Sequence, residues 1–172
     1  MGTHKIDYVS VETAEVAAMS KSASQITFQE QKVQDTWWDA LPLLSKNHSE
    51  SGSLGGDKFD PSFGGYQGLE AKGLLRVFTM RDGKQLVGYA IFLITPHMHY
   101  PSTKWAYQDV MYVAPEHRGR KAVEFMTWCD TQLRIAQVQY VYRHVSSSGK
   151  DYGRTLERMG YKMVERGFLK EL

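Results

Sequence analysis

The feature that most constrains the fold is a strand, a proline-containing turn and an amphipathic helix that follow one another between residues 105 and 136. The strand reads WAYQDVMYV, the turn reads APEHRGR, and the helix begins at Lys121. A strand followed by a one-sided helix predicts a domain of the α/β or α+β class, in which helices pack against a sheet. The apolar residues of the helix recur at spacings of three and four, on one face: Ala122, Phe125, Met126, Cys129, Leu133 and Ala136.

The turn ahead of this helix concentrates positive charge. Arg118, Arg120 and Lys121 surround the helix start, where the helix dipole disfavours each exposed cation by roughly 0.3–1 kcal/mol. The free N–H groups of a first helical turn attract phosphate, and a bound diphosphate would reverse the sign of that electrostatic term. A solvated loop with surface arginines is the alternative for these residues taken alone. Their position between a strand and a helix favours an anion-binding turn.

The composition and net charge of the chain limit which class of anionic partner binds this turn. The chain has 172 residues, 42% hydrophobic and 23% charged, which is typical of one globular domain. Twenty-one basic and nineteen acidic side chains leave a formal charge of +2, too balanced to indicate nucleic acid or an anionic membrane as the main partner. The absence of a long apolar run or a hydrophobic signal core predicts a soluble, cytoplasmic protein.

The cysteine count also indicates a cytoplasmic protein. Cys129 is the single cysteine, which excludes an internal disulfide framework and a cysteine metal cluster and indicates a reducing compartment. Because Cys129 lies on the apolar face of its helix, we expect a core residue rather than a nucleophile.

The rest of the chain predicts one domain behind a short leading segment. We expect residues 1–24 to be loosely attached and residues 25–172 to form the domain. Asp82-Gly83 predicts a hairpin turn, and Gly160 the end of a helix. The predicted helices cover residues 32–46, 121–136 and 152–159. The predicted strands cover residues 25–30, 74–80, 85–94, 105–113 and 138–145, with short strands at 161–164 and 168–172.

Two features interrupt this pattern. Pro42 falls inside the first predicted helix and predicts a kink or an early end. Residues 46–68 contain six glycines and one proline, which predicts a long loop of the kind that often serves as a lid or a binding loop.

From residue 25 to 172 the chain resembles the GCN5-related N-acetyltransferase (GNAT) superfamily, and within it the small acetyltransferases often carried by bacteriophages. The segments MYVAPEHRGRKAV and GRTLERMGYKMVE carry the resemblance. It implies a central mixed, mostly antiparallel twisted sheet of six to seven strands flanked by helices. It also implies acetyl-CoA as co-substrate, an amine that attacks the thioester directly, no metal, a possible homodimer, and the host cytoplasm as location if a phage encodes the protein.

In that superfamily, the pattern Arg/Gln-x-x-Gly-x-Gly/Ala after the fourth strand binds the pyrophosphate of acetyl-CoA. Here Lys121 stands where a glycine is usual and Val123 where Gly or Ala is usual. The resemblance further implies that backbone N–H groups of the fourth strand meet the pantetheine arm and stabilise the oxyanion. The expected cofactor-binding residues are therefore Met111, Tyr112, Val113, Arg118, Gly119, Arg120, Lys121, Ala122 and Val123.

Acetyl transfer needs a neutral amine. A lysine-like amine has a pKa of about 10.4 and is almost entirely protonated at neutral pH, so the enzyme needs a base. Asp109 is the candidate base, because it lies on the fourth strand two residues before Met111 and shares its face. A carboxylate that orients a histidine, or one at a solvated strand end, is an equal alternative. In the superfamily the usual general acid is a tyrosine in the last helix, and Leu156 occupies its place here. Tyr152, one turn earlier, is the substitute acid or a packing residue.

Two polar clusters are candidates for the acceptor pocket. His97, His99 and Tyr100 lie in PHMHYPS, and related phage-type enzymes show a His-Tyr pair there, which gives His99 a catalytic role and His97 and Tyr100 a role in substrate binding. Structural histidines are the second interpretation, and a metal site a distant third. His48 and Glu50 follow the first helix, where the superfamily places substrate-binding residues.

Two functions from different classes remain open. The first is an acetyl-CoA-dependent N-acetyltransferase that acts on a polyamine, an amino sugar, or a protein lysine or N-terminus. The second is a non-catalytic phage protein of the same fold, an inhibitor or structural component. The departures at Lys121, Val123 and Leu156 keep the second open.

Overall fold

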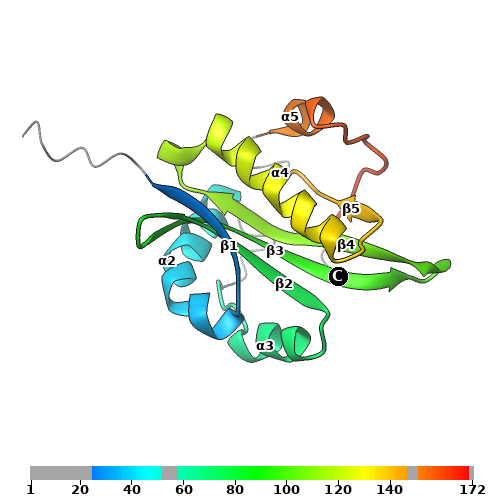
Figure 1. The fold of residues 1–172 in the computed structure, drawn as a ribbon, viewed down its shortest axis with the longest axis horizontal. Helices are drawn as coiled ribbons and strands as arrows, with labels where there is room; N and C mark the ends of the chain where they lie inside the picture. The colour runs from blue at the N-terminus through cyan, green and yellow to red at the C-terminus, as the bar shows by residue number, and fades with distance from the viewer. Residues whose placement is uncertain (1–24, 52–57, 147–150, 171–172) are drawn as a thin grey trace, which may run out of the picture.

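The computed structural model describes residues 25–51, 58–146 and 151–170 (Figure 1). The predicted N-terminal segment 1–24 lies outside the described residues. Five strands form one sheet in the order β1-β2-β3-β4-β5; β4 and β5 pair in parallel and all other neighbours antiparallel. This confirms the predicted fold class. The strands are β1 (Ile26–Gln31), β2 (Leu75–Asp82), β3 (Gln85–His97), β4 (Tyr100–Val113) and β5 (Tyr140–Tyr142).

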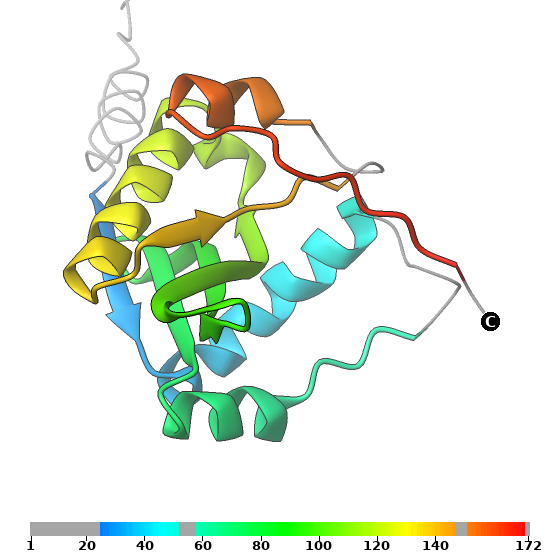
Figure 2. The ribbon, with the colours of Figure 1, turned by 90° about the vertical axis from the view of Figure 1, so that its right-hand side faces the viewer.

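Helices cover both faces of this sheet. Figure 2 shows the sheet between α4 on one side and α2 and α3 on the other. The helices are α2 (Val33–Ser51), α3 (Phe63–Ala71), α4 (Arg120–Ile135) and α5 (Gly153–Arg158), with a short 3-10 turn η1 (Pro115–His117) before α4. The chain therefore has two apolar layers, one on each side of the sheet.

The α4 layer follows the predicted helix face. Phe125, Met126, Cys129 and Leu133 are its buried residues. The ring of Phe125 lies 5.4 Å from that of Phe28 on β1. Cys129 is fully buried, and burial raises the pKa of its thiol. The prediction that Cys129 is a core residue is confirmed.

The α2 layer corrects two predictions. Of the two outcomes predicted for Pro42, the early end of the helix is wrong, since α2 continues to Ser51. Pro42 lies on the exposed side of the helix, where water can satisfy the carbonyl that loses its partner. The predicted loop at 46–68 is wrong at both ends, because α2 continues to Ser51 and α3 begins at Phe63; residues 52–57 lie outside the described residues. Ser62 caps α3 by accepting a hydrogen bond from Gly65 N at 3.1 Å.

The C-terminal part has fewer strands than predicted. The described sheet has five strands rather than six to seven, and residues 161–164 and 168–170 form none. The predicted strand at 138–145 is limited to β5, which pairs only with Trp105–Tyr107 of β4. The predicted helix end is correct: Gly160 follows the cap of α5 with φ at 92°, a conformation that favours glycine.

Candidate active site

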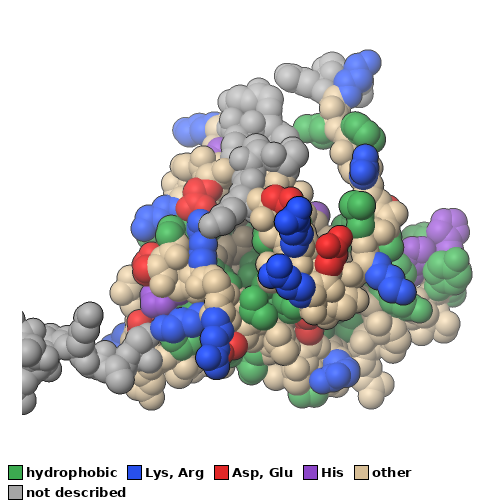
Figure 3. Space-filling view, turned by 90° about the horizontal axis from the view of Figure 1, so that it is seen from above, with side chains coloured by type: hydrophobic (Ala, Val, Ile, Leu, Met, Phe, Trp, Pro, Cys, Tyr) green, Lys and Arg blue, Asp and Glu red, His purple; other side chains and the backbone are tan. Residues whose placement is uncertain are grey.

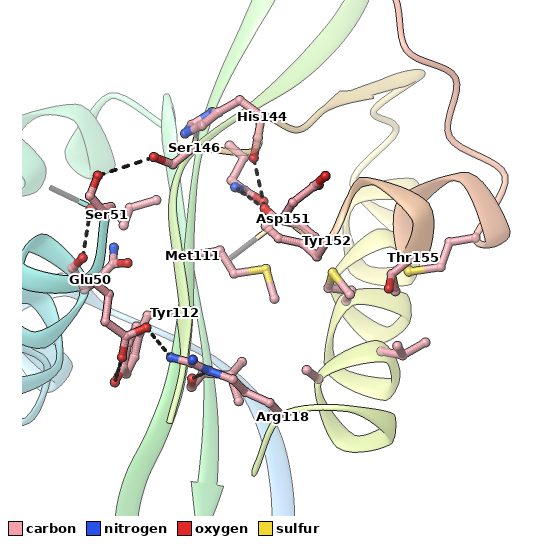
Figure 4. A pocket seen from close by; sticks show the side chains of 18 of the residues that line it. Glu50, Ser51, Met111, Tyr112, Arg118, His144, Ser146, Asp151, Tyr152 and Thr155 are labelled. Atoms are coloured by element: carbon pink, nitrogen blue, oxygen red, sulfur yellow. Dashed lines mark hydrogen bonds and ion pairs between the residues drawn. The ribbon is translucent and has the colours of Figure 1, made fainter. Parts of the chain in front are cut away.

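A cavity opens where β4 and β5 diverge. β5 pairs with β4 as far as Tyr107, and β4 then continues to Val113. Residues 108–113 all line a cavity of about 760 Å³, together with residues of α2, α4, α5 and the segment after β5. Figure 4 shows β4 crossing this cavity between α2 and α4. The strand thus offers one edge of its backbone to a ligand instead of to a neighbouring strand.

A β-bulge in β4 lies at the cavity. Phe92 on β3 pairs with Gln108 and Ile91 with Val110, so Asp109 is the extra residue without a partner on β3. A bulge of this kind shifts the alternation of side chains between the two faces of a sheet.

The contacts of the flanking residues follow from the bulge. Gln108 and Met111 both contact Arg143 on the α4 side. Asp109 contacts Tyr66 of α3 on the other side, and Tyr112 contacts α2 there. The prediction that Asp109 and Met111 share a face is therefore wrong, because it assumed an unbroken alternation.

Asp109 is an exposed carboxylate that lines the cavity. Its Oδ2 accepts a hydrogen bond from the Tyr66 hydroxyl at 2.8 Å. Burial, followed by the charge of Asp109, raises the pKa of Tyr66, so Tyr66 remains a neutral donor at ordinary pH. Among the described residues, the hydrogen-bond partner of Asp109 is this tyrosine and not a histidine. The arrangement leaves Asp109 oriented by α3 and open to the cavity.

The start of α4 has the geometry of an anion-binding turn. Gly119 is its N-cap, with φ at 77° and ψ at −128°, and no side chain in the described part of the molecule caps the helix. A Cβ added at Gly119 would meet nothing within 4 Å, so the backbone conformation, not space, requires glycine. Gly119, Ala122 and Val123 line the cavity.

The three predicted cations lie in different places. Arg118 lines the cavity, and its Nε donates to the Val113 carbonyl at 2.8 Å. The side chain of Arg120 is 92% exposed and pairs with Glu124 at 2.8 Å. Neither Arg120 nor Lys121 lines the cavity. The structure brings one of the three cations to the candidate site.

Glu50, a predicted substrate-binding residue, also lies at the cavity (Figure 4). Its Oε2 accepts from Nη2 of Arg118 at 2.6 Å, and its Oε1 accepts from the Tyr112 hydroxyl at 3.2 Å. Burial and the charge of Glu50 raise the pKa of Tyr112. His48 does not line the cavity; its ring packs 5.1 Å from that of Phe59.

Tyr152 closes the opposite wall, at the N-cap of α5. Its hydroxyl donates to the His144 carbonyl at 2.9 Å and accepts from Nε2 of Gln108 at 3.3 Å. Leu156 is buried in the same helix, so it packs where the superfamily's tyrosine is expected.

The structure does not bring the histidine cluster to the cavity. His97 ends β3, His99 lies in the turn, and Tyr100 begins β4. The ring of His97 lies 4.6 Å from Trp105 and 5.1 Å from Tyr100. The hairpin that carries them projects at one end of the molecule (Figure 1), where histidine and hydrophobic side chains gather (Figure 3). The segment is therefore a hairpin tip, and none of its three predicted site residues lines the cavity.

Arg143 does not line the cavity but contacts two residues that do, Gln108 and Met111, and the sequence did not reveal it. Its side chain is fully buried and donates to Asp130 Oδ1 at 2.6 Å. It also donates to Gln108 Oε1 and to the Tyr161 hydroxyl, both at 2.9 Å. Because Arg143 holds the amide oxygen of Gln108, the amide nitrogen points to Tyr152. A lone arginine in the apolar segment VQYVYRHV was the available signal, since a buried charge needs a partner.

The described residues show two further absences. They contain no group of three or more His, Cys, Asp or Glu side chains placed to hold a metal ion. No helix among them has the length and apolar character to cross a membrane. On the face drawn in Figure 3, basic and acidic side chains are interspersed.

Comparison with known proteins agrees with this geometry. The model of the family described as "Acetyltransferase (GNAT) family" matches residues 33–161. No curated protein matches the chain.

Solved structures show the same fold at low sequence identity. A ribosomal-protein-alanine N-acetyltransferase from Brucella melitensis biovar Abortus 2308 has a TM-score of 0.66 at 15% identity, covering 86% of this chain and 99% of its own. An aminoglycoside acetyltransferase from an uncultured soil metagenome, in complex with sisomicin, has a TM-score of 0.66 at 14% identity, covering 86% and 96%. A predicted acetyltransferase with acetyl-CoA from Clostridium acetobutylicum has a TM-score of 0.67 at 13% identity, covering 86% and 96%.

Proposed function

Because the chain belongs to the acetyltransferase (GNAT) family, we propose that it transfers an acetyl group from acetyl-CoA to a primary amine by direct attack. The observation that carries the proposal is the divergence of β4 from β5, which leaves residues 108–113 as an open strand edge along a large cavity. An extended thioester cofactor can pair with such an edge and reach the start of α4.

The cofactor's diphosphate would lie at the start of α4. The uncapped helix start and the cavity-lining Arg118 support this placement, since both favour an anion. Lys121 does not line the cavity, whereas Val123 does. Of the two departures from the usual pattern, Val123 is therefore the one whose side chain reduces room for phosphate.

The acetyl group would lie along β4, next to the bulge. Acetyl-CoA supplies the thioester carbonyl that the amine attacks. Backbone N–H groups of residues 111–113 are suited to stabilise the developing oxyanion, a contribution that is worth about 3 kcal/mol for a well-placed donor. The C–N bond forms, the C–S bond breaks, and the coenzyme leaves as a thiolate.

Asp109 is the proposed base. Asp109 lines the cavity, and its carboxylate is oriented by Tyr66 at 2.8 Å. It would attract the acceptor's ammonium group and take the proton that the amine loses, directly or through one water. Tyr152 is the proposed acid, since rotation of its O–H away from the His144 carbonyl would let it protonate the thiolate.

The acceptor side of the cavity favours a cationic amine. The acidic residues Glu50 and Asp109 both line it, and opposite charges attract strongly where water is partly excluded. Two of the solved structures with this fold are named as a ribosomal-protein-alanine N-acetyltransferase and an aminoglycoside acetyltransferase. A polyamine, an amino sugar and a protein amine all carry the required positive charge.

The proposal is tested by acetyl transfer itself. Acetyl-CoA is incubated with the protein and a panel of polyamines, amino sugars and peptides, and products are identified by mass spectrometry while released thiol is measured. We expect one acceptor class to give product. With that acceptor, Asp109→Asn should lower kcat by about 100-fold or more. Asp39→Asn is the control, because Asp39 pairs with Arg81 away from the cavity.

A negative result is also informative. If no acceptor gives product and acetyl-CoA does not bind at millimolar concentration, the acetyltransferase function is rejected. The alternative, a non-catalytic protein with this fold, would then account for the chain.

A further inference from the structure

The side chain best placed to meet the cofactor's diphosphate already holds a carboxylate. Arg118 Nη2 donates to Glu50 Oε2 at 2.6 Å, and the two residues are 68 positions apart in the sequence. Figure 4 shows the pair at the cavity, with Glu50 extending from α2 toward Arg118. The carboxylate of Glu50 thus occupies one of the N–H donors of Arg118, the guanidinium that we propose binds the diphosphate.

Other contacts restrict the orientation of Arg118. Its Nε donates to the Val113 carbonyl at 2.8 Å, and its Cζ lies 5.4 Å from the centre of the Tyr112 ring. These two contacts keep the guanidinium beside β4. With the orientation fixed, an incoming diphosphate must either displace Glu50 from Arg118 or bind beside its negative charge.

Glu50 is free to be displaced without unfolding its helix. It lies in the last turn of α2, which ends at Ser51, and its side chain is 42% exposed. Tyr112 donates to the other oxygen of Glu50 at 3.2 Å. A rotation about side-chain bonds can therefore separate Glu50 from Arg118 while Tyr112 holds it in the cavity.

We propose that Glu50 is an internal competitor of the cofactor for Arg118, and that cofactor binding releases its carboxylate to the ammonium group of the acceptor. This inference rests on the proposed function. In the empty protein Arg118 neutralises Glu50; with a diphosphate on Arg118, Glu50 keeps its hydrogen bond from Tyr112 but has no paired cation, so its charge can attract the acceptor's ammonium group. The acceptor then binds more tightly after the cofactor, and by linkage the cofactor binds more tightly when the acceptor is present.

A second ion pair at the same helix provides the control. Arg120 and Glu124 pair at 2.8 Å on the exposed surface of α4, and neither lines the cavity. Neutralising Glu124 changes the net charge by the same amount and leaves the Arg118–Glu50 pair intact. Any effect of Glu50→Gln beyond that of Glu124→Gln is therefore specific to the pair in the cavity.

The experiment is a calorimetric titration of acetyl-CoA into the wild type, Glu50→Gln and Glu124→Gln at low salt, where charge interactions are least screened. We expect Glu50→Gln to bind about fivefold more tightly than the wild type, the ratio given by ~1 kcal/mol. Glu124→Gln should bind as the wild type does. Thermal unfolding of each protein, with and without acetyl-CoA, provides a second measure: the cofactor should raise the Tm of Glu50→Gln most.

The outcomes separate this inference from the proposed function. Equal or weaker binding by Glu50→Gln, with a Tm rise no larger than that of the wild type, overturns the competition. In that case Glu50 supports Arg118 instead of competing for it, and the acetyltransferase function stands. Absence of binding in all three proteins overturns the proposed function, and the inference with it.

Discussion

The hydroxyl of Tyr66 donates to Oδ2 of Asp109 at 2.8 Å and so connects α3 to the bulge of β4. The bulge directs Asp109 away from Met111, and Tyr66 then fixes the orientation of its carboxylate. Tyr66 also packs against Trp37, with ring centres 6.0 Å apart. Tyr66 is therefore a positioning residue for the proposed base, on a helix that the sequence did not predict.

The first prediction concerns Tyr66→Phe. The ring and its packing stay, but Asp109 loses the donor that orients it, so we expect kcat to fall by about 10–150-fold, corresponding to roughly 1.5–3 kcal/mol for one hydrogen bond to a charged group. Steady-state kinetics with the identified acceptor checks this. The affinity for acetyl-CoA should not change, and Tyr100→Phe at the hairpin tip should leave kcat as it is.

Tyr152→Phe tests the proposed acid. A thiol with a pKa of about 8.5 is a good leaving group at neutral pH without a proton donor. We therefore expect kcat to fall by less than about tenfold, with a larger deficit for an acyl donor that has a poorer leaving group. A loss of several hundredfold would mean that Tyr152 does more than protonate the thiolate.

Arg143→Met tests the buried ion pair beneath the cavity. The Arg143 side chain is fully buried against Asp130, so its removal leaves a carboxylate with no cation and should lower the free energy of unfolding by about 3 kcal/mol. The double variant Arg143→Met/Asp130→Leu should recover much of this loss. Urea unfolding measures both, and a single variant as stable as the wild type would show that the pair contributes nothing.

Alkaline stability tests Tyr161. Burial raises its pKa to about 12, above the ordinary value of about 10 in the unfolded chain. Because the folded state holds this proton more tightly, the stabilisation is complete below pH 10 and is lost as pH rises toward 12. Compared with Tyr161→Phe, the wild type should lose unfolding free energy more steeply between pH 10 and 11.5. Parallel curves would contradict the raised pKa.

The parts of the fold that local chemistry determines were predictable from the sequence. The spacing of Phe125, Cys129 and Leu133 predicted the buried face of α4, and Gly160 predicted the end of α5. In each case the determining residues lie within a few turns of one another. Helix α3 was not predicted, because its three glycines are typical of a loop. Ser62, which caps the helix, was the local feature that indicated it.

The candidate site depended on contacts between distant residues. The bulge at Asp109 results from the pairing of β4 with β3, and no local pattern in β4 distinguishes it from a regular strand. The cationic turn predicted an anion site, but the sequence could not separate Arg118, which lies at the cavity, from Arg120, which is exposed. Arg118 contacts Glu50 on a helix far away in the chain and the Val113 carbonyl, whereas Arg120 pairs with Glu124 one turn along its own helix.

The two arginines provide a test of where the cofactor binds. Acetyl-CoA is titrated into the wild type, Arg118→Gln and Arg120→Gln, which lose the same charge at the same helix start. We expect saturable binding by the wild type, at least about tenfold weaker binding by Arg118→Gln, corresponding to ~1.4 kcal/mol or more, and nearly unchanged binding by Arg120→Gln. Equal affinity of Arg118→Gln and the wild type would contradict the placement of the cofactor at this corner of the molecule.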